Sequence, residues 1–225
     1  MERSSRLRLA VFDCDGTLVD SQRTIAAAVS AAFASVGLAP PAPEQSRRVI
    51  GLPLAEALEA LVPAGAGVDA ARLTEPYRQA FFALRSRADF AEPLFPGIAE
   101  ALAALEAEGY LLGIATGKSR RGLERTLERH ALLGRFTTLQ TSDQGPGKPH
   151  PHMLERAIAE TGVEAASCVM VGDTTFDVAM ARAAGAKALG VGWGYHGADE
   201  LAAAGAHSIV AEASELPPAI QALLP

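Results

Sequence analysis

The chain has 225 residues, of which 49% are hydrophobic and 20% charged, and its formal net charge is −6. This length predicts one large domain, or a core with a smaller module, and the acidic balance disfavours nonspecific binding to nucleic acid or an anionic membrane surface. No apolar stretch approaches the roughly 18–20 residues of a membrane span, the apolar run at 7–12 is too short for a signal peptide, and two cysteines make no disulfide framework, so we expect a cytoplasmic protein.

The first half of the chain reads as one strand followed by helices. Residues 7–12 form a short apolar run that ends abruptly at an acidic, glycine-containing segment, which is typical of a buried strand entering a loop. Residues 21–36 are rich in alanine and carry apolar side chains four apart, which predicts a helix. Helical patterns resume over 44–62, with a break at Gly51 and Pro53, and again over 68–88.

The second half of the chain alternates strands with helices. Strands are expected at 110–115, 136–140, 168–172, 187–191 and 208–210, and helices at 98–108, 120–130, 152–160, 176–184 and 199–204. Such alternation predicts right-handed β-α-β units, and therefore a doubly wound, Rossmann-like parallel sheet of the α/β class. Ligands of these folds bind beyond the carboxyl ends of the strands.

The helices between the first strand and the alternating half predict an all-helical cap inserted at the active-site end of the sheet. We expect the core to comprise residues 1–18 and 92–225, and the cap residues 19–91. The hinges would lie near 17–21 and 92–97. The alternative is a set of extra packed helices with no mobility.

Polar side chains gather at three of the predicted strand ends. Asp13 and Asp15 lie two apart and so face the same side of an extended segment, whereas Asp173 and Asp177 share one face if a helix has begun. Taken singly, each has a simpler interpretation, such as a solvated acidic turn, or helix capping by Asp173. Thr116 could likewise only start a helix.

The charges of this cluster favour a metal. Two like charges 4 Å apart repel by about 4 kcal/mol at an effective dielectric of 20. Four carboxylates with one lysine, Lys148, could not stay ionised together without a cation. Hard oxygen ligands that leave room for water and phosphate suit Mg²⁺.

Four ordered motifs make the chain recognisable. It resembles the haloacid dehalogenase-like superfamily, specifically its phosphatases with a small helical cap, and within these the phosphoglycolate phosphatase group. The motifs are Asp13-Cys14-Asp15-Gly16-Thr17-Leu18-Val19, Thr116-Gly117, Gly147-Lys148-Pro149 and Gly172-Asp173-Thr174-Thr175-Phe176-Asp177.

The resemblance implies a role for each motif residue. Asp13 would be the nucleophile that becomes an aspartyl phosphate, and Asp15 the general acid and base. Thr116 and Gly117 would hold phosphate oxygens, and Lys148 would offset the charge of nucleophile and phosphoryl group. Mg²⁺ would be bound by Asp13, the Asp15 carbonyl oxygen and Asp173, while Asp177 would bind it through water or orient Lys148.

The resemblance leaves other activities open. Dehalogenases of this superfamily lack an acid at the position of Asp15, so phosphate chemistry is preferred. A sugar phosphomutase or an inorganic pyrophosphatase of the same superfamily remains an alternative. A phosphate-accepting receiver module also uses acids, a Thr and a Lys at strand ends, but it is shorter and has no cap.

Three other motifs are interpreted as false signals. Residues 113–119 have one residue too few between their glycines for a P-loop, and the glycines of 190–194 precede no helix, so a turn bordering the pocket is expected there. His150 and His152 have no metal-binding partners at suitable spacing. The position of Cys14 between two acids should raise the pKa of its thiol, and we take this cysteine to be structural.

The substrate must be inferred from the cap. Arg47 or Arg48, next to the break at residues 50–53, could pair with a substrate carboxylate, which would suit phosphoglycolate; the alternative is that both are solvated. Tyr77 and Arg78 are weaker candidates. We expect a small phosphorylated metabolite as the partner, no nucleic acid or membrane, and a monomer or homodimer.

Overall fold

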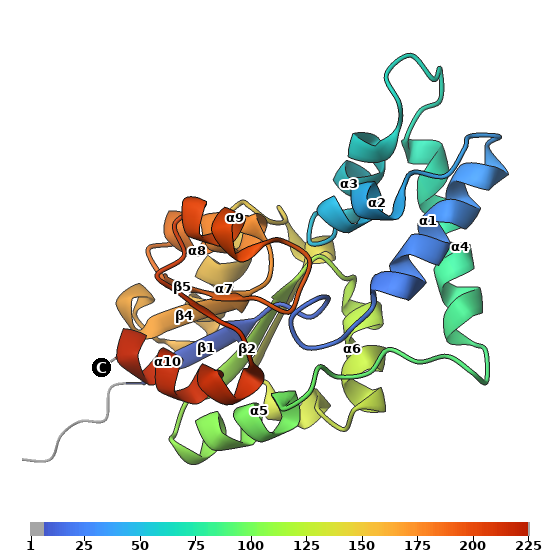
Figure 1. Cartoon of the computed structure of the whole chain (residues 1–225). Coiled ribbons are helices and arrows are strands. Elements are labelled where there is room, and N and C mark those ends of the chain that lie inside the picture. Colours follow the sequence, from blue (N-terminus) through green and yellow to red (C-terminus); the bar gives the residue numbers. More distant parts are fainter. Residues whose placement is uncertain (1–6, 225) are drawn as a thin grey trace, which may run out of the picture.

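A six-stranded, all-parallel sheet forms the centre of the protein. The computed structural model describes residues 7–224 (Figure 1), and the strand order is β3-β2-β1-β4-β5-β6. The strands are β1 (Leu9–Phe12), β2 (Leu111–Thr116), β3 (Thr138–Thr141), β4 (Cys168–Gly172), β5 (Lys187–Val191) and β6 (Ser208–Val210). The predicted doubly wound α/β fold is therefore confirmed.

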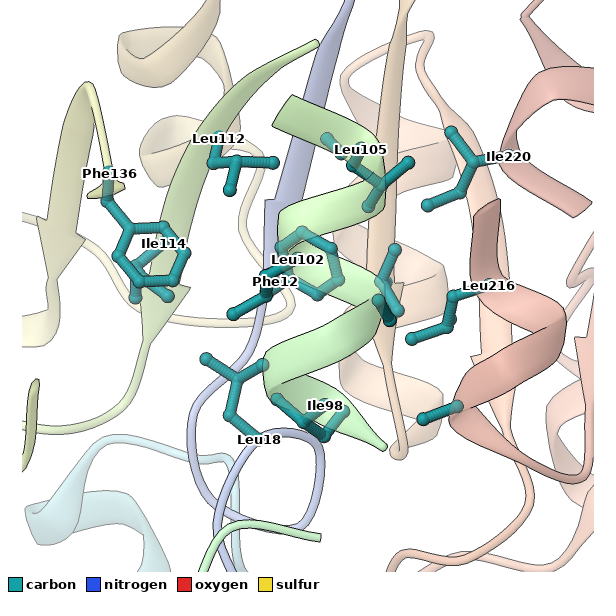
Figure 2. Close-up of a cluster of buried hydrophobic side chains, with 14 of the residues drawn as sticks. Phe12, Leu18, Ile98, Leu102, Leu105, Leu112, Ile114, Phe136, Leu216 and Ile220 are labelled. Carbon is teal, nitrogen blue, oxygen red and sulfur yellow. The ribbon is translucent and has the colours of Figure 1, made fainter. Parts of the chain in front are cut away.

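Successive side chains of the central strand β1 point in opposite directions, and all four of its residues are apolar. Both faces of the sheet are therefore apolar, and helices cover both of them. Ala10 and Phe12 belong to one apolar core and Leu9 and Val11 to the other. Figure 2 shows the first core, where Phe12 packs beneath the leucines of one of its helices. That face carries α5 (Ile98–Ala107), α6 (Arg120–Arg129) and α10 (Leu216–Leu223), and the other face α7 (His152–Thr161), α8 (Thr175–Ala183) and α9 (Ala198–Ala203).

Four further helices lie between β1 and β2 in the chain and stand away from the sheet (Figure 1). Their own small core joins Val29, Phe33, Leu58 and Leu73. These cap helices are α1 (Gln22–Ser35), α2 (Pro43–Arg48), α3 (Leu54–Leu61) and α4 (Ala71–Arg85). The expected helical pattern over 44–62 is broken where predicted, between α2 and α3.

One helix was not expected. The series inferred from the sequence ends at residue 210, but α10 follows and packs Leu216 and Ile220 into the core. Two prolines, Pro217 and Pro218, lie in its first turn, where the backbone amides have no intrahelical acceptor and proline is tolerated. The helix therefore begins on residues that usually indicate a break.

The register of the sheet decides what its carboxyl edge presents. Phe12 of β1 is aligned with Ile114 of β2 and with Val171 of β4, so the loops after these three adjacent strands leave the sheet side by side.

No helix within residues 7–224 is long and apolar enough to cross a membrane. The expected core segments 1–6 and 225 lie outside the described residues.

Candidate active site

Asp13 lies at the centre of the carboxyl edge, one residue beyond β1. Its backbone amide still donates to the Val171 carbonyl oxygen at 2.9 Å, so the sheet fixes its position. The side chain is buried, and its Oδ1 accepts the Cys14 amide hydrogen at 2.7 Å and lies 2.8 Å from Lys148 Nζ. Its Oδ2 is buried without a hydrogen-bond partner. An ionised oxygen in that setting is costly unless a cation or a ligand contacts it.

Lys148 links Asp13 to Asp177. Its ammonium is fully buried and lies 2.6 Å from Asp177 Oδ1. Burial opposes the charge, but the two carboxylates outweigh it and raise the pKa of Lys148 above its usual value. The other oxygen of Asp177 accepts from the Thr174 amide at 3.0 Å and hydroxyl at 2.7 Å, so Thr174 and Asp177, rather than Asp173, cap α8. Both Asp177 oxygens are thus occupied by protein groups.

Asp173 completes a buried acidic triad after β4. Its Oδ1 accepts from the Thr17 hydroxyl at 2.8 Å and its Oδ2 from the Tyr195 amide at 2.9 Å. A Cβ on Gly16, whose φ is +84°, would overlap the Asp173 side chain, as would one on Gly194. The chain is therefore wrapped closely around this carboxylate, and the glycine-rich segment 190–194 is the expected turn at the site.

The triad has the geometry of a cation site. One carboxylate oxygen each from Asp13, Asp173 and Asp177 lie within 4.8 Å of one another. Burial raises the pKa of Asp13 to about 6, against the lowering effect of Lys148. Burial and the neighbouring acids raise the pKa of Asp173 as well. The triad concentrates negative charge on hard oxygen atoms, and one of these atoms, Asp13 Oδ2, has no hydrogen-bond partner. Both features fit a small divalent ion such as Mg²⁺.

Asp15 is paired with residues that the sequence interpretation missed. Its Oδ1 lies 2.6 Å from Lys118 Nζ and accepts from the Ser21 hydroxyl, which is also 3.2 Å from the Tyr195 hydroxyl. Burial opposes the charge of Lys118, but Asp15 helps to raise its pKa above the usual value. The chain has only three lysines; Lys148 is fully buried, and the side chain of Lys118 is 8% exposed. Lys118 directly follows the Thr116-Gly117 motif in the chain, and this adjacency to a motif at a strand end is the sequence feature that points to it.

Thr116 ends β2 and Gly117 follows it, and both line the same cavity as Asp13 and Asp15. Thr116 is buried, and its hydroxyl accepts the Lys118 amide hydrogen at 3.3 Å. Ser119, not Thr116, caps α6 by accepting from the Gly122 amide. The Thr116 hydroxyl is therefore not used to begin the helix.

Arg47 and Arg48 are placed away from this cavity. An Arg47 guanidinium nitrogen donates to the Gly194 carbonyl oxygen at 2.6 Å, and Arg48 forms a surface ion pair with Glu200 at 2.5 Å. The break between α2 and α3 does reach the site, as expected, and Tyr77 and Arg78 line the cavity. The cap's contribution to the cavity thus comes from other residues than the two arginines.

Cys14 and Cys168 are free and buried. Burial first, and the charge of Asp15 second, raise the pKa of Cys14 well above its usual value, which agrees with the structural role expected for it.

The chain is similar to haloacid dehalogenase-like hydrolases and to named phosphatases. A sequence model of the haloacid dehalogenase-like hydrolase family matches residues 10–191. A Dickeya dadantii protein named "Probable phosphatase IndB" is 37% identical, with 96% of this chain and 94% of that protein covered. A Chromobacterium violaceum phosphoglycolate phosphatase is 33% identical, with 88% and 90% covered. The crystal structure of a hydrolase from Pseudomonas syringae superposes with a TM-score of 0.83 at 26% identity, covering 97% of this chain and all of that one.

Proposed function

The chain belongs to the haloacid dehalogenase-like hydrolase family, and on that premise we propose that it is a Mg²⁺-dependent phosphomonoester hydrolase acting through a phosphorylated Asp13. The observation that carries the proposal is the buried, unpartnered Oδ2 of Asp13 beside Asp173 and Lys148. A carboxylate held between a lysine and a cation site is poised to approach an anionic phosphoryl group.

The metal would be held by Asp13, Asp173 and the backbone carbonyl oxygen of Asp15. When bound, Mg²⁺ supplies positive charge that offsets the phosphoryl oxygens and the acidic triad. Asp177 has both oxygens committed to Thr174 and Lys148, which supports the orienting role for it rather than direct ligation.

The reaction would proceed in two displacements at phosphorus. An Asp13 carboxylate oxygen forms a bond to phosphorus while the bond to the ester oxygen breaks, and Asp15 gives a proton to that leaving oxygen. Water then attacks the same phosphorus, Asp15 takes its proton, and the Asp13–phosphorus bond breaks to free inorganic phosphate. Thr116, Gly117 and Lys148 would hold and neutralise the phosphoryl group throughout, since positioning and charge stabilisation dominate this chemistry.

The pairing of Asp15 with Lys118 and Ser21 supports a fixed position for its carboxyl group. Two partners fix the carboxyl group at the edge of the cavity, where a leaving oxygen on Asp13-bound phosphorus would lie. The two free, buried cysteines favour a reducing compartment such as the cytoplasm.

The proposal is tested by phosphate release from p-nitrophenyl phosphate with Mg²⁺ and with excess chelator. We expect many turnovers per chain with Mg²⁺ and none with chelator. Asp13→Asn should abolish turnover, whereas Asp199→Asn, at an exposed aspartate of α9, should not. Chelator-resistant turnover or an active Asp13→Asn variant would refute the proposal, and a single phosphorylation without turnover would indicate a receiver-like module instead.

A further inference from the structure

The acidic site opens into a cavity far larger than the phosphoryl group needs. It has a volume of about 510 Å³ and extends from Asp13, Asp15 and Thr116 to the cap. That volume lies within the roughly 300–1,000 Å³ of pockets that enclose drug-sized ligands. A phosphoryl group bound at Asp13 would occupy only the end next to the sheet, so most of the space would face the leaving group.

The part of the cavity beyond the catalytic end is mainly apolar. Three cap helices supply its walls, and two of their aromatic rings, Tyr77 and Phe81, stack with centroids 5.7 Å apart. Lys118 Nζ lies 5.5 Å from the centre of the Phe81 ring, so the aromatic wall begins directly beside the Asp15 pair. The apolar lining includes Ile25, Val29, Leu54, Ala57, Leu58, Leu61, Tyr77, Phe81 and Phe82, and four arginines, Arg78, Arg85, Arg121 and Arg125, line the same cavity.

The cap is already seated on the core, so this volume is not that of a lifted cap. A Cβ on Gly117 would lie only 2.9 Å from the Leu52 carbonyl oxygen, and one on Gly147 would overlap Pro53. On the other side, Arg85 of α4 donates to the Gly122 carbonyl oxygen at 3.1 Å and to the Thr126 hydroxyl at 2.8 Å on α6. Contacts at both sides leave little room for the cap to close further and shrink the cavity.

We propose that the substrate of this enzyme is a phosphomonoester with an extended leaving group that has an apolar, planar face, held against Tyr77 and Phe81. This inference rests on the proposed phosphatase function and narrows its substrate class. A two-carbon acid such as glycolate would leave most of the apolar wall in contact with water. An extended apolar body would bury that wall and gain the hydrophobic contribution to binding.

The test compares kcat/KM for three esters: phosphoglycolate, p-nitrophenyl phosphate and 4-methylumbelliferyl phosphate. We expect the bicyclic ester to have the lowest KM and a kcat/KM at least tenfold above that of phosphoglycolate. Methylumbelliferone is a poorer leaving group than nitrophenol, so a lower KM for its ester would reflect binding rather than reactivity.

Filling the cavity provides the matched test. Ala57→Phe on α3 places a ring into the cavity that Ala57 lines, whereas Ala60→Phe places one on the exposed side of the same helix. We expect the first variant to raise KM for 4-methylumbelliferyl phosphate at least tenfold with phosphoglycolate unchanged, and the second to change neither. Thr74→Phe fills the same cavity from α4 and should repeat the result if Ala57→Phe does not fold.

The outcomes separate the two proposals. If wild-type protein hydrolyses p-nitrophenyl phosphate but prefers phosphoglycolate, or if the filling variants affect all three esters equally, the substrate inference is wrong and the phosphatase stands. If no ester is hydrolysed, the phosphatase function fails and the inference fails with it.

Discussion

Replacing Lys148 with methionine tests the electrostatic balance of the site. The variant keeps a side chain of similar length but removes the ammonium that lies 2.8 Å from Asp13 and 2.6 Å from Asp177. Carboxylate oxygens of the triad lie within 4.8 Å of one another, where two like charges repel by about 3.5 kcal/mol or more at an effective dielectric of 20. Removing one partner of a buried ion pair costs about 3–5 kcal/mol, and we expect a loss of that size in the free energy of unfolding.

The assay is urea unfolding of metal-free protein at about pH 7.5 and about pH 5. The deficit of the variant relative to wild type should shrink at the lower pH, because protonation of Asp13, whose pKa burial raises to about 6 in the wild-type site, removes uncompensated charge. Added Mg²⁺ should also reduce the deficit. Lys187→Met, at the start of β5, should change stability by less than about 0.5 kcal/mol. A deficit below about 1 kcal/mol, or one independent of pH and Mg²⁺, would refute the reasoning.

Three further predictions follow from the same site. Asp173→Asn should weaken Mg²⁺ binding at least tenfold by isothermal titration, about 1.4 kcal/mol; an affinity within a factor of two would show that Asp173 is not a ligand. In metal-free protein the raised pKa of Asp13 means that its carboxyl group stays protonated to a higher pH in the folded state than in the unfolded state. The free energy of unfolding should therefore fall as pH rises from about 4 through about 6. The difference between 3.8 and about 6 sets the fall at about 3 kcal/mol, and a profile equal to that of Asp13→Asn would contradict it. Lys118→Met should lower kcat by roughly tenfold or more, because Asp15 loses the ammonium that lies 2.6 Å from its Oδ1, while Lys187→Met should leave kcat unchanged. An effect on KM alone would point to substrate binding instead.

The sequence predicts the sheet and the acidic cluster because both depend on local patterns. Short apolar runs that end at Asp13, Thr116 and Asp173 locate adjacent strand ends, and parallel topology then brings those ends together. The structure agrees, with oxygens of Asp13, Asp173 and Asp177 within 4.8 Å. Little beyond strand periodicity and right-handed connection is needed for that part of the site.

The surroundings of the site depend on contacts that local patterns do not encode. Arg47 and Arg48 have long side chains on a short helix, and the packing of α2 against the core turns them towards Gly194 and Glu200. The pairing of Lys118 with Asp15 joins two loops about a hundred residues apart. Residue type alone suggested an arginine that binds a substrate carboxylate, whereas tertiary packing decides which basic side chain lies in the cavity.

The central claim is that Asp13 carries the phosphoryl group during turnover. Acid-quenching the wild-type protein during steady-state hydrolysis of p-nitrophenyl phosphate with Mg²⁺, followed by peptide mass spectrometry, tests it most directly. We expect a phosphoryl adduct on the peptide containing Asp13, located at that residue and absent when chelator is present. An adduct on another side chain during full turnover would contradict it.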